Sequence, residues 1–143
     1  MTKQDYKEIY NVVGAAMEVH KTLGRGMEEP IYQESLAIEM NKRGMIAERE
    51  KELQLTYKDV VLKKTYRADF YYNGIIIELK SVTEIISDHR AQLFNYMRIT
   101  GRLRGILFNF GEKFLRSERY LYLPDEDDFV LLTQDNYKDF ITD

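Results

Sequence analysis

The sequence predicts an α/β protein with a mixed β-sheet flanked by helices, and two observations support this prediction. Apolar residues recur at helical spacing over three ranges: 4–22, 29–43 and 87–100. Runs typical of strands cover 46–55, 60–62, 66–80, 105–110 and 119–123. A series of hairpins followed by a strand, a helix and a strand is typical of a mixed sheet with helices on its faces.

Glycine and proline mark the ends of the expected helices. Gly24 and Gly26 interrupt the first helical pattern, so LGRGM is expected to be a tight connection. Pro30 lies in the first turn of the second helix, where the missing N–H has no helical partner to lose. Gly44 and Gly101 follow the last periodic residues of the second and third helices, as C-terminal glycines usually do.

The stretch Tyr66–Lys80 predicts a hairpin whose register can be derived. Asn73-Gly74 is the strongest short signal for a two-residue type I′ turn, and such a turn fixes the pairing outward from it. Asp69 then lies opposite Glu78. One face is expected to be continuously apolar: Tyr66, Ala68, Phe70, Tyr72, Ile75, Ile77 and Leu79. The other face carries Arg67, Asp69, Tyr71, Ile76, Glu78 and Lys80.

Two opposed carboxylates disfavour folding unless something compensates them. At about 5 Å and an effective dielectric near 20, the repulsion is roughly 3 kcal/mol. A divalent cation bound by Asp69 and Glu78 would remove it, and Mg²⁺ or Mn²⁺ suits such ligands. With Lys80 on the same face, the set predicts metal-assisted phosphodiester hydrolysis. The alternative is a polar strand face whose charges meet only solvent.

Length and composition indicate a single domain over residues 1–143, with a core at about 5–123. The acidic end at 124–143 is expected to be weakly ordered, although residues 129–132 could dock on the core. The chain has no cysteine, which excludes disulfides and cysteine-bound metal centres. The amino terminus lacks a signal-peptide pattern and no run is long enough to span a membrane. We therefore expect a cytoplasmic protein without a membrane partner.

The net charge of −3 argues against a protein that passively coats nucleic acid. An enzyme needs only local basic residues around its groove. Six residues could contact phosphates if they gather around one site: Lys63, Lys64, Arg67, Arg98, Arg102 and Arg104.

Polar residues outside the hairpin extend the candidate site. Glu29 and Tyr32 lie three residues apart and share a helix face, although an acid at a helix start can simply complement the helix dipole. His89, Gln92 and Tyr96 recur at helical spacing on one stripe of the third helix. Each of the three also has a structural alternative.

Several of these motifs occur together in one known family. GMEEPIY at 26–32 matches G-x-x-E-x-x-Y, and RADFYYNGIIIELKSV, HRAQLFNYMRITG and GILFNFG follow in the family's order and spacing. Over roughly residues 8–111 the chain resembles the GxxExxY proteins of the PD-(D/E)XK nuclease superfamily. The resemblance implies a restriction-endonuclease-like core. Ala68 stands where the motif usually has proline, a position that varies widely.

The resemblance also implies roles for individual residues. Asp69, Glu78 and Lys80 match the catalytic motif, and Glu29 matches an additional acid that assists metal binding. Gln92 and Tyr96 resemble the Q-x-x-x-Y helix that lines the site in exonucleases. The backbone carbonyl of Leu79 is a further metal ligand in related folds. Tyr32, His89 and Arg67 complete the residues that we expect to line the site or bind substrate.

The sequence therefore predicts a Mg²⁺- or Mn²⁺-dependent nuclease, with DNA favoured over RNA as substrate. Two alternatives stay open: a non-catalytic nucleic-acid or protein interaction module that kept the fold, and a phosphodiesterase acting on a small substrate. A protein partner or a homo-oligomer is compatible with either reading.

Overall fold

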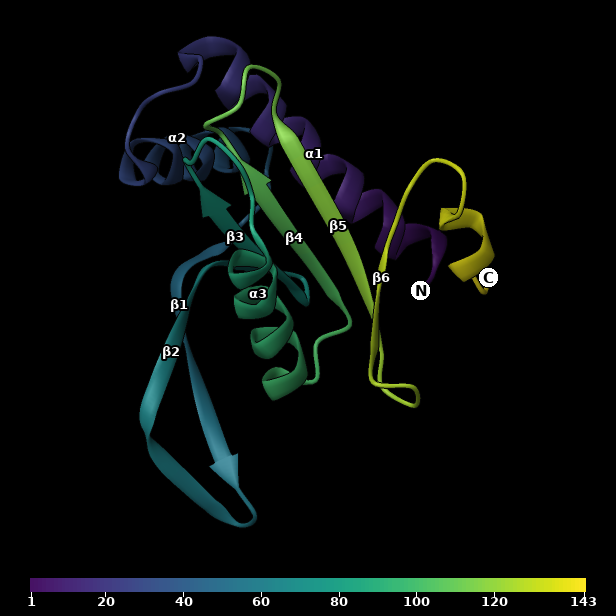
Figure 1. The fold of residues 1–143 in the computed structure, drawn as a ribbon. Coiled ribbons are helices and arrows are strands. Elements are labelled where there is room, and N and C mark those ends of the chain that lie inside the picture. Colours follow the sequence, from purple (N-terminus) through teal and green to yellow (C-terminus); the bar gives the residue numbers. More distant parts are fainter.

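The computed structural model describes all 143 residues and contains a six-stranded sheet with helices on both faces (Figure 1). The helices are α1 (Lys3–Leu23), α2 (Glu29–Lys42), α3 (Ser87–Thr100) and the short 3₁₀ helix η1 (Tyr137–Phe140). The strands are β1 (Glu48–Tyr57), β2 (Val60–Tyr72), β3 (Ile75–Lys80), β4 (Arg104–Asn109), β5 (Arg116–Leu123) and β6 (Asp128–Leu131). The α/β fold with a mixed sheet is confirmed. No helix is long and apolar enough to cross a membrane.

The strands lie in chain order, and only one neighbouring pair is parallel. β3 and β4 run parallel, whereas every other pair is antiparallel. Parallel neighbours need a crossover connection, and α3 provides it between β3 and β4. The crossover brings the start of α3 beside the end of β3, where the predicted site residues lie.

Each face of the sheet has its own hydrophobic core. α1 and α2 cover one face, packing Val12, Ala16 and Leu36 against Ile77 and Phe108. α3 covers the other, where Leu93 and Met97 pack against Ile76 and Leu107. Both faces of β3 are therefore buried, as is usual for a strand in a parallel pair.

The hairpin turn and its register are confirmed. Asn73 and Gly74 both have positive φ angles, 47° and 84°, as a type I′ turn requires. Tyr72 pairs with Ile75, and Phe70 pairs with Ile77.

The prediction of one continuous apolar face on the hairpin is wrong. Phe70 belongs to the core under α1 and α2, but Ala68 belongs to the core under α3, although both were expected on one face. The change occurs around Asp69, beside Glu50 of β1, which has a φ of 50°. A non-glycine residue in this region disturbs strand geometry, so the alternation of faces does not continue through it.

The carboxyl-terminal end is more ordered than expected, and residues 129–132, which the sequence left open as a docking stretch, do pack on the sheet. Residues 124–143 contain β6 and η1, and Leu132 is buried in the first core. Tyr137 of η1 stacks on Tyr6 of α1 with 4.2 Å between ring centroids. The Met1 ammonium donates to the Phe140 carbonyl at 3.0 Å, so the two chain ends lie together, as Figure 1 shows. Aromatic and apolar residues stand between the acids of this segment, and burial of their side chains holds the segment on the core.

Candidate active site

Asp69 of β2 and Glu78 of β3 lie side by side and share hydrogen bonds through the backbone. The Asp69 amide donates to Glu78 Oε1 at 3.2 Å. The Leu79 amide donates to Asp69 Oδ2 at 2.8 Å. The Glu78 residue is only 3% exposed, and Asp69 is half-buried. The hairpin register therefore places two acids at one partly dry site.

The environment disfavours the charged form of both acids. Burial raises the pKa of Glu78 well above its usual value, and the nearby Asp69 charge raises it further. Burial also raises the pKa of Asp69, although the hydrogen bond from Leu79 opposes this shift. Burial, and for Glu78 also the neighbouring Asp69 charge, thus penalises the ionised carboxylates of this site.

Lys80 and Glu29 are electrostatic neighbours of this pair. The positive charge of Lys80 lowers the pKa values of Asp69, Glu78 and Glu29, in each case against a larger effect of burial. Glu29 is the first residue of α2, and desolvation together with the Asp69 charge raises its pKa. The four predicted residues are therefore brought together from α2, β2 and β3.

α3 contributes Gln92 and Tyr96. The Gln92 side-chain amide donates to the Tyr96 hydroxyl at 2.9 Å. Burial raises the pKa of Tyr96, and the charges of Glu78 and Asp69 add to the shift. The predicted stripe thus faces the acids, four residues apart on one helix face.

Tyr32 lies behind the site rather than on its surface. It is fully buried, and its ring stacks on Phe110 at 4.5 Å between centroids. Its hydroxyl donates to the Gly24 carbonyl at 2.6 Å and accepts from the Met27 amide at 3.2 Å. These bonds hold the loop that leads into α2. Tyr32 therefore fixes the segment that precedes Glu29.

His89, Leu79 and Arg67 have less direct positions. His89 Nδ1 accepts from the Ile86 amide at 3.1 Å and so caps α3. Leu79 is buried, and its amide is the donor to Asp69. Arg67 is exposed, lies across from Glu52 on β1, and makes no hydrogen bond or ion pair.

Two further residues at the site were missed by the sequence analysis. Gln33 Nε2 donates to Asp69 Oδ1 at 3.2 Å and to Glu50 Oε1 at 2.9 Å. The Glu50 charge raises the pKa of Asp69. Gln33 lies four residues after Glu29, so helical spacing could have indicated it. Nothing in the sequence pattern singles out Glu50.

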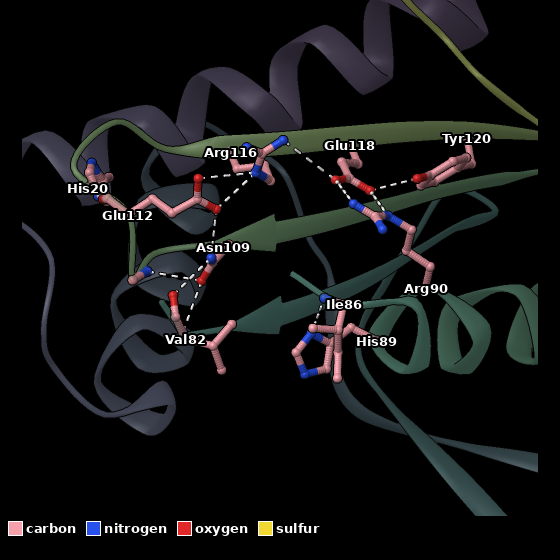
Figure 2. Close-up of polar contacts among 11 residues, drawn as sticks. His20, Val82, Ile86, His89, Arg90, Asn109, Glu112, Arg116, Glu118 and Tyr120 are labelled. Carbon is pink, nitrogen blue, oxygen red and sulfur yellow. Dashed lines mark hydrogen bonds and ion pairs between the residues drawn. The ribbon is translucent and has the colours of Figure 1, made fainter. Parts of the chain in front are cut away.

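A buried polar network holds the segment that follows Lys80 (Figure 2). Asn109 is fully buried at the end of β4, and its side chain accepts from the Val82 amide at 3.0 Å and donates to the Val82 carbonyl at 2.9 Å. Asn109 also donates to Glu112 at 2.7 Å. The Phe110 amide donates to the Lys80 carbonyl at 2.8 Å. The end of β3 is therefore anchored at the Lys80 carbonyl and again at Val82, two residues further on.

The comparison with protein families agrees with this geometry. The model that describes the PD-(D/E)XK nuclease superfamily matches residues 6–120. This chain belongs to the PD-(D/E)XK nuclease superfamily. The fold is consistent with the restriction-endonuclease-like domain of this superfamily, and membership suggests nuclease activity.

Comparisons with individual proteins add little. No curated protein matches the chain. Among solved structures, the protein of the "Crystal structure of SSO0001" is similar, with 23% identity and a TM-score of 0.46. The match covers 63% of this chain and 50% of SSO0001, so the chain spans about half the length of that protein.

PD-(D/E)XK nucleases generally use divalent metal ions, and the donor chemistry here fits one. Carboxylate oxygens are the ligands that Mg²⁺ and Mn²⁺ prefer, and burial raises the pKa values of Asp69 and Glu78, a penalty that a bound cation would offset. No group of three or more His, Cys, Asp or Glu side chains is arranged to hold a metal ion. Asp69 and Glu78 instead accept hydrogen bonds from backbone amides, and Glu29 comes from a separate helix.

Proposed function

We propose that this protein is a Mg²⁺- or Mn²⁺-dependent nuclease that hydrolyses phosphodiester bonds of DNA or RNA, and that it belongs to the GxxExxY group within its superfamily. One observation carries the proposal: Asp69 and Glu78 are held together in a partly buried site with Lys80 as their cationic neighbour. A solvated strand face would leave these charges in water, at little cost. We further propose that residues 1–143 act as one catalytic domain.

In this proposal, Asp69 and Glu78 hold the cation, with Glu29 as an additional acid and the Leu79 carbonyl as a further ligand. The bound ion supplies an acidified water molecule and neutralises charge that develops on the phosphate. Gln33 keeps Asp69 and Glu50 in place through its two hydrogen bonds.

Lys80 orients the attacking water and stabilises negative charge on the phosphorane oxygens. Its anchored position between Leu79 and the segment bound by Asn109 suits this role, since a displacement of about 1 Å can lower rates strongly. The Gln92–Tyr96 pair contacts the substrate or orients Lys80. His89, Arg67 and Tyr32 support substrate binding, Tyr32 through the loop that it holds.

Calorimetric titration with Mn²⁺ tests the site before any substrate is chosen. Wild type should bind the ion and Asp69→Ala should lose most of the affinity. Glu126→Ala, which removes an exposed acid in the turn before β6, serves as control and should bind like wild type. Binding of equal strength by all three proteins would contradict the site.

Cleavage assays on plasmid DNA and on RNA then test the reaction. Asp69→Ala, Glu78→Ala and Lys80→Ala should lose Mn²⁺-dependent cleavage, and Lys80→Ala should still bind Mn²⁺ because it removes no ligand. A protein that binds Mn²⁺ but cleaves only small phosphodiesters would point to a phosphodiesterase. A protein that binds nucleic acid without metal or cleavage would be an interaction module.

A further inference from the structure

β1 and β2 form a ribbon that extends beyond the sheet. The two strands stay paired up to the Lys58-Asp59 turn, and this half of the ribbon projects away from the helices in Figure 1. Four apolar side chains near the turn are exposed rather than buried: Tyr57, Val60, Val61 and Leu62. Val60 is 64% exposed. Exposed apolar residues that cluster on a projecting element mark an interaction surface.

The same segment is basic within an acidic protein. Between residues 53 and 68 there are four basic side chains, Lys58, Lys63, Lys64 and Arg67, and one acid, Asp59. The segment thus has a net charge of +3, whereas the whole chain has −3. A charge distribution of this kind favours a polyanionic partner locally while it disfavours one elsewhere on the surface.

The ribbon is continuous with the candidate site through β2. β2 carries the ribbon at one end and Asp69 near the other. Tyr66, at the base of the ribbon, packs on Tyr96 of α3 with 5.5 Å between ring centroids, and Lys64 lies 5.7 Å over the Tyr66 ring. A partner bound by the ribbon is therefore held at a defined distance from the acids.

A concave surface at the base of the ribbon is lined by cations and an acid. This cavity of about 610 Å³ lies between β1 and the end of α3, and Lys51, Tyr71 and Arg102 contribute to its lining. The Arg102 guanidinium lies 5.2 Å and the Lys51 ammonium 5.9 Å from the centre of the Tyr71 ring. Glu52 also lines the cavity, and Lys51 pairs with Glu48 at 2.9 Å, so Arg102 is the cation that adds positive charge at the base of the ribbon.

The dimensions of the ribbon fit double-stranded DNA. The ten residues from Val60 to Asp69 span about 30 Å when extended, close to the roughly 34 Å of one helical turn of duplex. The major groove of B-form DNA, about 12 Å wide, admits a two-stranded β-ribbon. The major groove of A-form RNA is too narrow for side chains to read.

We propose that the β1–β2 ribbon is a DNA-binding arm that lies in the major groove of a duplex, about one helical turn from the cleavage site. The inference rests on the proposed nuclease function and deepens it by naming duplex DNA as the substrate class. The lysines contact phosphates, and Val60 at the tip makes apolar contacts with the groove floor, where thymine methyl groups are exposed. Val61, the next residue of β2, points to the opposite face of the ribbon.

Fluorescence anisotropy in EDTA tests this binding without any cleavage. The probes are a 30-base-pair DNA duplex, an RNA duplex of the same sequence and a 10-base-pair DNA duplex, each titrated at several salt concentrations. The variants are Lys58→Gln/Lys63→Gln/Lys64→Gln and Val60→Ala/Val61→Ala, all at exposed positions. The control, Lys3→Gln/Lys7→Gln/Lys21→Gln, removes three exposed lysines from α1.

Wild type should prefer the long DNA duplex to both other probes. The ribbon lysine variant should bind it about tenfold more weakly, and its slope of log affinity against log salt should be smaller by about 3, since each lost phosphate contact removes about 1. The valine variant should bind more weakly with an unchanged slope, because apolar contacts release no counterions. The α1 control should behave like wild type.

Equal effects of the ribbon and α1 substitutions would overturn the proposal, as would equal affinity for the DNA and RNA duplexes. A dimer in sedimentation experiments that Val60→Ala/Val61→Ala dissociates, with DNA binding unchanged, would assign the ribbon to a second copy of the chain instead. Mn²⁺-dependent plasmid cleavage, measured in parallel, separates the two proposals. Cleavage without ribbon-dependent binding refutes only the arm, and ribbon-dependent binding without cleavage refutes only the nuclease.

Discussion

The backbone of Asp69 binds the side chain of Glu78, while the side chain of Asp69 binds the backbone of Leu79. These reciprocal bonds hold two carboxylates together even though like charges on paired strands repel each other. The hairpin thus carries an electrostatic cost in the absence of a cation. Such a cost at a buried pair is typical of functional sites, where environments shift pKa values.

Replacement of Asp69 by Asn should stabilise the metal-free protein. Removal of one charge relieves the repulsion on Glu78, by about 1 kcal/mol after screening by solvent. Millimolar Mn²⁺ should raise the melting temperature of wild type, because a ligand that binds only the folded state stabilises it. Asp69→Asn should therefore melt above wild type in EDTA and lose most of the gain from Mn²⁺. Equal Mn²⁺ shifts in both proteins would contradict the metal site.

The Gln92–Tyr96 pair is predicted to affect turnover more than stability. Gln92→Ala and Tyr96→Phe remove the polar ends of the pair but keep most of the packing, and Tyr96→Phe retains the ring that contacts Tyr66. We expect kcat to fall about tenfold or more, with a loss of stability near 1 kcal/mol for the hydrogen bond. The opposite outcome, a large drop in melting temperature with normal kcat, would assign both residues a structural role.

The ion pair between Arg90 and Glu118 predicts a pH dependence of stability (Figure 2). Arg90 binds both Glu118 oxygens, at 2.7 and 2.9 Å, and Tyr120 donates to Glu118 at 2.6 Å. These bonds, led by those from Arg90, lower the pKa of Glu118 below its usual 4.5. Stability from this pair is fully present above about pH 4.5 and is lost as the pH falls through the folded-state pKa.

Urea unfolding at pH 7 and at pH 3 measures this contribution. Glu118→Gln should be less stable than wild type by about 2 kcal/mol at pH 7, and the difference should shrink at pH 3. Glu112→Gln is the matched control, since the pKa of Glu112 is also lowered, but its pair with Arg116 is more exposed and worth less than about 1 kcal/mol. A Glu118→Gln difference that stays constant with pH would exclude this linkage.

Gly111 is predicted to be essential for the position of the segment after Lys80. A Cβ at Gly111 would overlap the backbone nitrogen and carbonyl of Val82, and backbone atoms cannot rotate away. Gly111→Ala should therefore cost about 2 kcal/mol and also lower the cleavage rate. Gly14→Ala in α1 is the control: its Cβ meets only the end of the Arg43 side chain at 3.4 Å, and it should stabilise the helix by up to about 1 kcal/mol. Normal activity of Gly111→Ala would show that this contact does not position Lys80.

The sequence by itself determined the features that depend on neighbours in the chain. The ends of α3 at Ser87 and Thr100 follow from periodicity and from the glycine after it. The register that places Asp69 beside Glu78 follows from the Asn73-Gly74 turn, because a two-residue loop leaves only one pairing. The nuclease motif could be recognised because its residues are close together in the chain.

The tertiary structure decided whatever depends on contacts between distant segments. Glu50 joins the site because β1 lies beside β2. Glu50 adopts a positive φ next to Asp69, and no local sequence pattern indicates this conformation. Asn109 anchors the end of β3 because the α3 crossover makes β4 its parallel neighbour. The carboxyl-terminal segment is ordered because the Tyr137 ring stacks on the Tyr6 ring of α1. In each case the stabilising partner is more than ten residues away, so only the folded chain brings the two together.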